Sequence, residues 1–96
     1  MSNQETVLAD KTNPKVYPNP FSNKFTFEFH STENARLEVL VNNALGQLVY
    51  RKSVQVVPGT QSVEISYEEL GQSGNVFIYN IVNEGQPVKS GMILHR

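Results

Sequence analysis

The chain has 96 residues, enough for one domain of modest stability but too few for a deep, walled active-site cleft. Its formal charge of -1, from 8 Lys+Arg against 9 Asp+Glu without long runs of either sign, argues against a nucleic-acid partner and a polybasic membrane anchor. With no cysteine, the sequence excludes disulfides, cysteine-ligated zinc and iron–sulfur clusters, and no apolar run approaches the length of a membrane-spanning helix.

The first part of the chain is polar. Residues 1–13 lack the cationic start and apolar centre of a secretory signal peptide, which leaves open a cytosolic protein or an excised fragment of a longer one. We expect residues 1–14 to form a flexible, linker-like lead and residues 15–96 to form the single domain. A short extended piece is expected at 15–17.

Alternation of apolar and polar residues dominates the domain and predicts strands with one buried face. It is clear over 24–29, where three phenylalanines share a face, and again over 36–41. Residues 42–46 then carry the Asn and Gly residues that reverse a chain tightly. The side chains expected inside are Phe25, Phe27, Phe29, Leu37, Val39 and Val41.

The same pattern continues in the middle of the chain. A long strand is expected over 47–57, followed by a turn at 58–59 and a further strand over 62–67. The inward side chains of the long strand are expected to be Leu48, Tyr50, Val54 and Val56.

An irregular corner over 68–74 leads to 75–82, which is apolar at nearly every position. That composition predicts a central strand that is buried on both faces or covered on its outer face. A turn at 84–87 precedes the last strand, 88–94. About seven strands at roughly ten-residue spacing predict an all-β, Ig-like sandwich of two antiparallel sheets, and the missing Cys–Trp–Cys pattern excludes an antibody-type domain.

Several motifs follow one another in a fixed order. They are Tyr17-Pro18-Asn19-Pro20-Phe21, Phe25-Thr26-Phe27, the strand 37–41, Leu45-Gly46-Gln47-Leu48-Val49, Gly59, a block running from Leu70 to Phe77 through Gly74, and the strand 89–94. From about residue 16 to residue 96, this series resembles the type A C-terminal sorting domain of Bacteroidetes proteins exported by the type IX secretion system. Asn42-Asn43 and Val76 depart from residues common in that family without changing strand or turn chemistry.

The resemblance implies a non-catalytic secretion signal whose cargo lies on its N-terminal side. Such a signal is carried from the periplasm across the outer membrane to the cell surface or the exterior. The implied partners are the translocon, shuttle and sortase-like components of the type IX machinery. The signal would be cut in or near 7–15, and the cargo attached to a surface lipopolysaccharide or released.

The resemblance also implies site residues. The signal-motif residues are Tyr17, Pro18, Asn19, Pro20, Phe21, Gly46, Gly59 and Gly74. The residues expected to be recognised by the export machinery are Lys89, Ser90, Gly91, Met92, Ile93, Leu94, His95 and Arg96, because the family carries essential information at its extreme C-terminus.

The last strand has two interpretations. In the first, Val88, Met92 and Leu94 pack in the core or along an edge, while Lys89 and Arg96 are solvated charges. In the second, the strand is an exposed edge that pairs with a partner strand through main-chain hydrogen bonds.

The sequence contains no pattern typical of an enzyme, a cofactor site or a metal site. His30 and His95 lie at strand ends without a partner at metal-ligand spacing, and we expect both to be solvent-exposed bystanders. Glu68-Glu69 lie in a polar corner. The turn glycines do not form a phosphate-binding loop. We therefore expect neither catalysis nor a bound cofactor or metal.

Two other functions remain open. An Ig-like carbohydrate-binding or adhesion module of a surface protein is the alternative, although Trp is absent and Tyr50, Tyr67 and Tyr79 each fit an alternating strand face. A spacer or assembly domain of the kind found in flagellar hook-cap proteins is the third.

Overall fold

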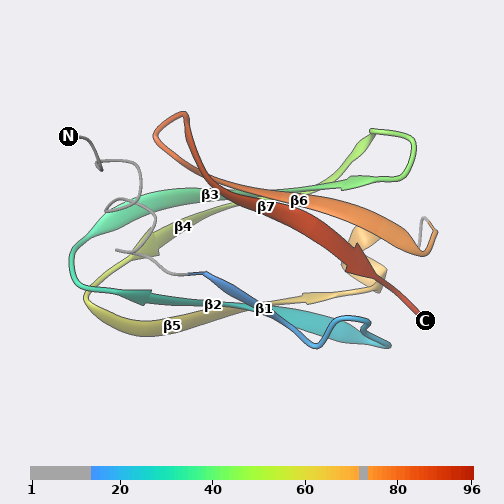
Figure 1. Ribbon diagram of the computed structural model, residues 1–96, viewed down its shortest axis with the longest axis horizontal. Helices are drawn as coiled ribbons and strands as arrows, with labels where there is room; N and C mark the ends of the chain where they lie inside the picture. The colour runs from blue at the N-terminus through green and yellow to red at the C-terminus, as the bar shows by residue number, and fades with distance from the viewer. Residues whose placement is uncertain (1–13, 72–73) are drawn as a thin grey trace.

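Two antiparallel sheets packed face to face make up the fold in the computed structural model, which describes residues 14–71 and 74–96 (Figure 1). The three-stranded sheet has the order β1-β2-β5, and the four-stranded sheet has the order β4-β3-β6-β7. The bounds are β1 Lys15–Tyr17, β2 Lys24–Ser31, β3 Ala35–Asn43, β4 Leu48–Val56, β5 Gly59–Ser66, β6 Val76–Asn83 and β7 Gln86–Leu94, with a 3-10 helix, η1, at Glu68–Leu70. The predicted all-β, Ig-like sandwich is confirmed.

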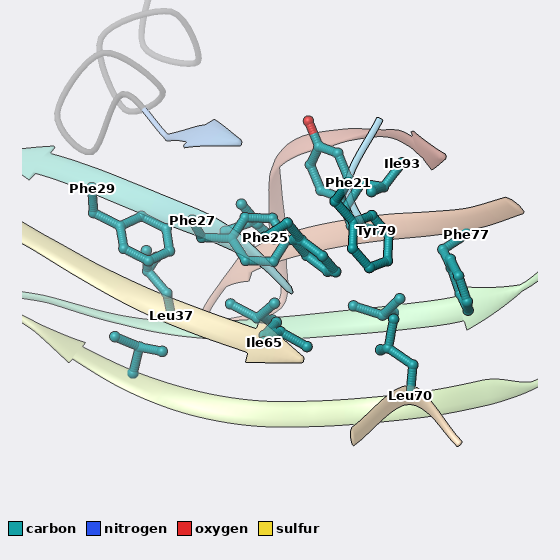
Figure 2. Close-up of a cluster of buried hydrophobic side chains, with 14 of the residues drawn as sticks. Phe21, Phe25, Phe27, Phe29, Leu37, Ile65, Leu70, Phe77, Tyr79 and Ile93 are labelled. Carbon is teal, nitrogen blue, oxygen red and sulfur yellow. The ribbon is translucent and has the colours of Figure 1, made fainter. Parts of the chain in front are cut away.

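The core lies between the sheets and is rich in aromatic rings. Phe25, Phe27 and Phe29 project from β2 and are fully buried, as the alternation predicts (Figure 2). They meet the inward side chains of β3 and β6, and Phe27 packs edge-on against Tyr79 with the ring centroids 5.3 Å apart. Because each buried aromatic side chain removes a large apolar area from water, this layer supplies most of the stabilisation available to a domain of this size.

The start of β4 differs from the prediction. Leu48 was expected inside, but it is 51% exposed. The register between β3 and β4 shifts at Val41/Asn42, so that Val41 pairs with Tyr50 and Asn42 pairs with Leu48. Because a one-residue bulge reverses the facing of every residue beyond it, Leu48 lies on the outer face of the sheet.

The facing of β6 also differs from the prediction. Its apolar composition indicated burial on both faces or a covered outer face, but only Phe77, Tyr79 and Ile81 are buried. Ile78, on the opposite face, is 36% exposed. The strand is central in its sheet, between β3 and β7, yet its outer face carries apolar side chains in contact with solvent.

Both edge strands of the four-stranded sheet carry a lysine in an inward register. Lys52 on β4 pairs with buried Val39, and Lys89 on β7 pairs with buried Ile81. Both lysines are exposed. An inward-pointing charge on an edge strand opposes pairing with another sheet, since that pairing would bury the charge.

Candidate functional site

The segment Tyr17–Phe21, called the strap below, runs from the end of β1 to the outer edge of β7. It contains two cis peptide bonds, Tyr17-Pro18 and Asn19-Pro20. The side-chain amide of Asn19 lies against the backbone of β7: its Nδ2 donates to the Met92 carbonyl and its Oδ1 accepts from the Leu94 amide, each at 2.9 Å. One amide side chain thus satisfies a donor and an acceptor that a neighbouring strand would otherwise pair.

The backbone of Phe21 continues this pairing. Its amide donates to the Leu94 carbonyl at 2.8 Å, its carbonyl accepts from the Arg96 amide at 3.0 Å, and Phe21 forms a parallel bridge with His95. The outer edge of β7 is therefore occupied over its last residues. The interpretation of the last strand as a free edge is wrong for Met92 to Arg96, because the strap takes the place of a partner strand there.

Aromatic rings close the same junction from inside. The Phe21 side chain is 1% exposed and packs edge-on against Phe25 and His95 at centroid distances of 4.8 and 5.1 Å. The His95 ring stacks on Tyr67 at 3.6 Å with an interplanar angle of 2°, and the Tyr67 hydroxyl donates to the Gly74 carbonyl at 2.9 Å. His95 was expected to be a solvated bystander, but it is half-buried in this cluster because its ring covers Phe21 and Tyr67.

The junction also includes two residues that the sequence did not identify as site residues. The His95 amide donates to the Asn75 carbonyl at 2.8 Å, and Tyr67 supplies the ring on which His95 stacks. No local pattern marks either residue as part of the site. The only sequence signal was the position of Asn75, directly after Gly74 in the quoted block.

Gly91 in β7 is needed for close packing. It lies opposite Tyr79 in the ladder, and a Cβ at this position would be 2.7 Å from the Tyr79 hydroxyl and 2.8 Å from the ring.

The last side chains of β7 alternate between the core and the solvent. Ile93 is fully buried, as Figure 2 shows beside Phe21, while Met92 is 54% exposed and Leu94 is 39% exposed. Met92 and Leu94 are not core residues, because Ile93 occupies the inward position between them.

The upstream half of β7 is arranged differently. Lys89 extends from β7 and donates from Nζ to the Pro14 carbonyl at 3.0 Å. Val88 packs partly against the core, as one interpretation expected, and Ser90 is exposed. The hydrogen bonds that join the strap to β7 begin at Met92.

The three signal-motif glycines do not share one place. Gly46, Gly59 and Gly74 adopt φ angles of +85°, +115° and +108°, and none has a heavy atom within 4 Å of the position of an added Cβ. Each glycine is therefore required by backbone conformation and not by space. Only Gly74, through its carbonyl bond from Tyr67, connects with the strap and the end of β7.

The described residues offer little for chemistry. Among residues 14–71 and 74–96 no three His, Cys, Asp or Glu side chains gather as a metal site, and no helix there is both long and apolar enough to cross a membrane. Burial raises the pKa of the Tyr79 phenol, and the pKa of Tyr50 is raised by burial and by the nearby Glu69 carboxylate.

A surface pocket of about 400 Å³ lies beside the junction of the strap and β7. Its lining is Ser22, Asn23, Ser66, Tyr67, Glu68 and His95.

Comparison with solved structures supports the architecture alone. The chain resembles β-glucosidase 3B from Thermotoga neapolitana in complex with α-D-glucose (TM-score 0.56, 10% identity, 86% of this chain and 15% of that one). It also resembles a β-glucosidase from Kluyveromyces marxianus (0.52, 8%, 88% and 14%) and the alkylpurine DNA glycosylase AlkC from Pseudomonas fluorescens, bound to DNA containing an abasic site analog (0.52, 13%, 86% and 29%). At such low identity and over so small a part of each longer chain, these likenesses show a shared sandwich and nothing about catalysis.

No curated protein matches the chain. A family does: residues 15–94 match the Secretion system C-terminal sorting domain. The matched range begins at the first residue of β1 and ends at the last residue of β7. A family defined by sorting is consistent with the expectation that the chain is not an enzyme. The chain therefore belongs to the family of C-terminal sorting domains that act as signals for type IX secretion.

Proposed function

We propose that residues 15–96 are a folded export tag that directs a cargo on their N-terminal side across the outer membrane through the type IX machinery. On this proposal residues 1–14 connect tag and cargo. The cargo passes through the periplasm, and the sortase-like component cuts in or near residues 7–15. The cargo is then attached to a surface lipopolysaccharide or released. The family match over 15–94 is the observation that carries the proposal.

The junction of the strap and β7 supports an assignment of the recognised element. The two parts of the family motif that are farthest apart in sequence, Tyr17–Phe21 and Lys89–Arg96, contact each other through hydrogen bonds and rings. We therefore assign Lys89 to Arg96 as the stretch bound by the translocon or shuttle, and the strap as the element that fixes its position. Residues held by a rigid scaffold bind with less ordering cost than a free tail.

A reporter fusion tests the export role. A fluorescent protein with a periplasmic signal peptide is joined to residues from Thr6 onward and expressed in a type IX-competent bacterium. The expected result is reporter at the cell surface or in the medium. The matched control is the same fusion in a strain that lacks the translocon, where the reporter stays in the periplasm. Periplasmic retention of the fusion in the competent strain would refute the proposal.

The same fusion locates the cut. Mass spectrometry is expected to show that the exported reporter ends within or next to residues 7–15. An exported reporter that still carries the intact domain would refute the cleavage step, while the export role would stand.

A further inference from the structure

We propose that the outer face of the four-stranded sheet is a docking surface, through which the domain transiently binds an apolar surface on a protein of the export machinery. The surface, called the outer patch below, consists of Leu48, Ile78, Met92 and Leu94. This inference rests on the proposed export role, which supplies the partner, and adds the surface by which that partner recognises the tag.

The strand register places these side chains together. Ile78 pairs with Met92 and Val76 pairs with Leu94, so the side chains of Met92 and Leu94 lie on one face with their neighbours on β6. Asn42 pairs with Ile78 on one side and with Leu48 on the other, which extends the same row across the sheet. The exposed fractions are 51% for Leu48, 36% for Ile78, 54% for Met92 and 39% for Leu94.

Met92 and Leu94 are the apolar side chains at the end of β7 that remain available to a partner. The strap already binds the outward main-chain groups of Met92 and Leu94. Farther upstream, the inward register of Lys89 opposes the addition of another strand. Ile93 is fully buried. A partner that contacts the end of β7 therefore meets the outward side chains Met92 and Leu94.

The chemistry of the surface selects the occupant. The outer patch contains no charged residue, and Arg51, on the same face of the sheet, is paired with Glu38 at 2.9 Å. A phosphate-rich partner, such as a nucleic acid or an anionic lipid surface, would find no cation within the patch. The outer patch is therefore suited to contact with apolar side chains on a protein partner.

The size of the outer patch argues for transient contact and against a second copy of the chain. Its four side chains expose on the order of 350 Å², within the range of functional patches on monomers but below the ~800 Å² that each partner buries in a stable interface. A cargo tag must leave its receptor after each passage. A small apolar contact allows that release.

Substitutions on two exposed sites test the inference in the reporter fusion. Met92→Ser, alone and combined with Ile78→Ser, removes apolar surface from the outer patch. Val57→Ser is the matched control, because Val57 is 45% exposed and lies beyond the end of β4, outside the patch. We expect the double variant to reduce the exported fraction at least tenfold, which corresponds to about 1.4 kcal/mol of binding, and Val57→Ser to leave it unchanged. Thermal unfolding of each purified chain verifies folding.

The outcomes separate the two proposals. Export of the double variant at the parental level would overturn the outer patch as a docking surface, while the export role would stand. Failure of the parental fusion to leave the periplasm would overturn the export role and this inference with it. A sedimentation profile that shows a dimer abolished by Met92→Ser would also overturn the inference, in favour of contact between copies. A photo-crosslinking residue at position 92, but not at position 57, is expected to capture a machinery component.

Discussion

Replacing Asn19 by alanine tests whether the strap holds β7 in place. The variant removes two hydrogen bonds to the β7 backbone, both 2.9 Å long and both at an exposed position. At about 0.5–1.5 kcal/mol each, their loss lowers the free energy of unfolding by about 1–3 kcal/mol, because water can rehydrate the freed groups. For a domain of this size, the melting temperature then falls by about 5–15 °C.

Two further variants sharpen the measurement. Asn19→Asp keeps an oxygen for the Leu94 amide but loses the donor to the Met92 carbonyl, so it retains at most half of the contribution. Asn42→Ala is the matched control, because Asn42 makes one exposed hydrogen bond, to the Gly46 carbonyl at 2.9 Å, in a hairpin distant in sequence from the strap. We expect it to cost no more than half as much as Asn19→Ala.

Amide hydrogen exchange followed by NMR is the direct assay. In Asn19→Ala the Leu94 amide is expected to exchange faster, while the amide of Ile93, which lies in the ladder opposite Phe77, keeps its protection. In Asn42→Ala both amides keep theirs. Unchanged melting temperature together with unchanged exchange at Leu94 would refute the role of the strap as a substitute strand.

Three more results are expected. Gly91→Ala lowers the free energy of unfolding by about 1–3 kcal/mol, because the added Cβ would meet the Tyr79 ring. In a double-mutant cycle measured by urea denaturation, Tyr79→Leu is expected to recover part of that loss, and strict additivity of the two substitutions would contradict the contact. Phe21→Ala, at a fully packed site, lowers it by about 3–5 kcal/mol, while Val57→Ala changes it by less than 0.5 kcal/mol in the same titration. The raised pKa of Tyr79 means that the folded state holds the phenolic proton more tightly than the unfolded state does. The contribution of this group to stability is therefore complete below about pH 10 and is lost as the pH rises beyond it. Tyr79→Phe is expected to lose less stability between pH 9 and pH 12 than the parent, and an equal loss in both would refute Tyr79 as the cause.

Local pattern was sufficient for most of the strands. Alternation placed Phe25, Phe27 and Phe29 in the core because a regular strand shows each face at every second residue. It failed at Leu48, where a bulge changes the facing, and bulges leave no mark in hydropathy. In β6 the apolar composition led to a wrong prediction of burial on both faces, because the outward side chains are apolar although solvent reaches them.

The candidate site was predictable only in part. The motif resemblance named both Tyr17–Phe21 and Lys89–Arg96, but nothing in the sequence indicates that the two segments touch. Asn19 contacts Met92 and Leu94 across 73 and 75 positions, and periodicity carries no information about partners so far apart. His95 was interpreted as a bystander for the same reason, since its stacking partner, Tyr67, lies on a different element.

The junction also orders events during synthesis. Phe21 is translated long before Leu94 and Arg96, and until those residues leave the ribosome its backbone groups and its ring lack the partners that they have in the finished domain. A polypeptide that stops short of these positions lacks the hydrogen bonds and ring contacts that join the strap to the end of β7. The complete junction therefore forms only in a chain that has been translated through Arg96, which makes the structure a check on completeness as well as an address.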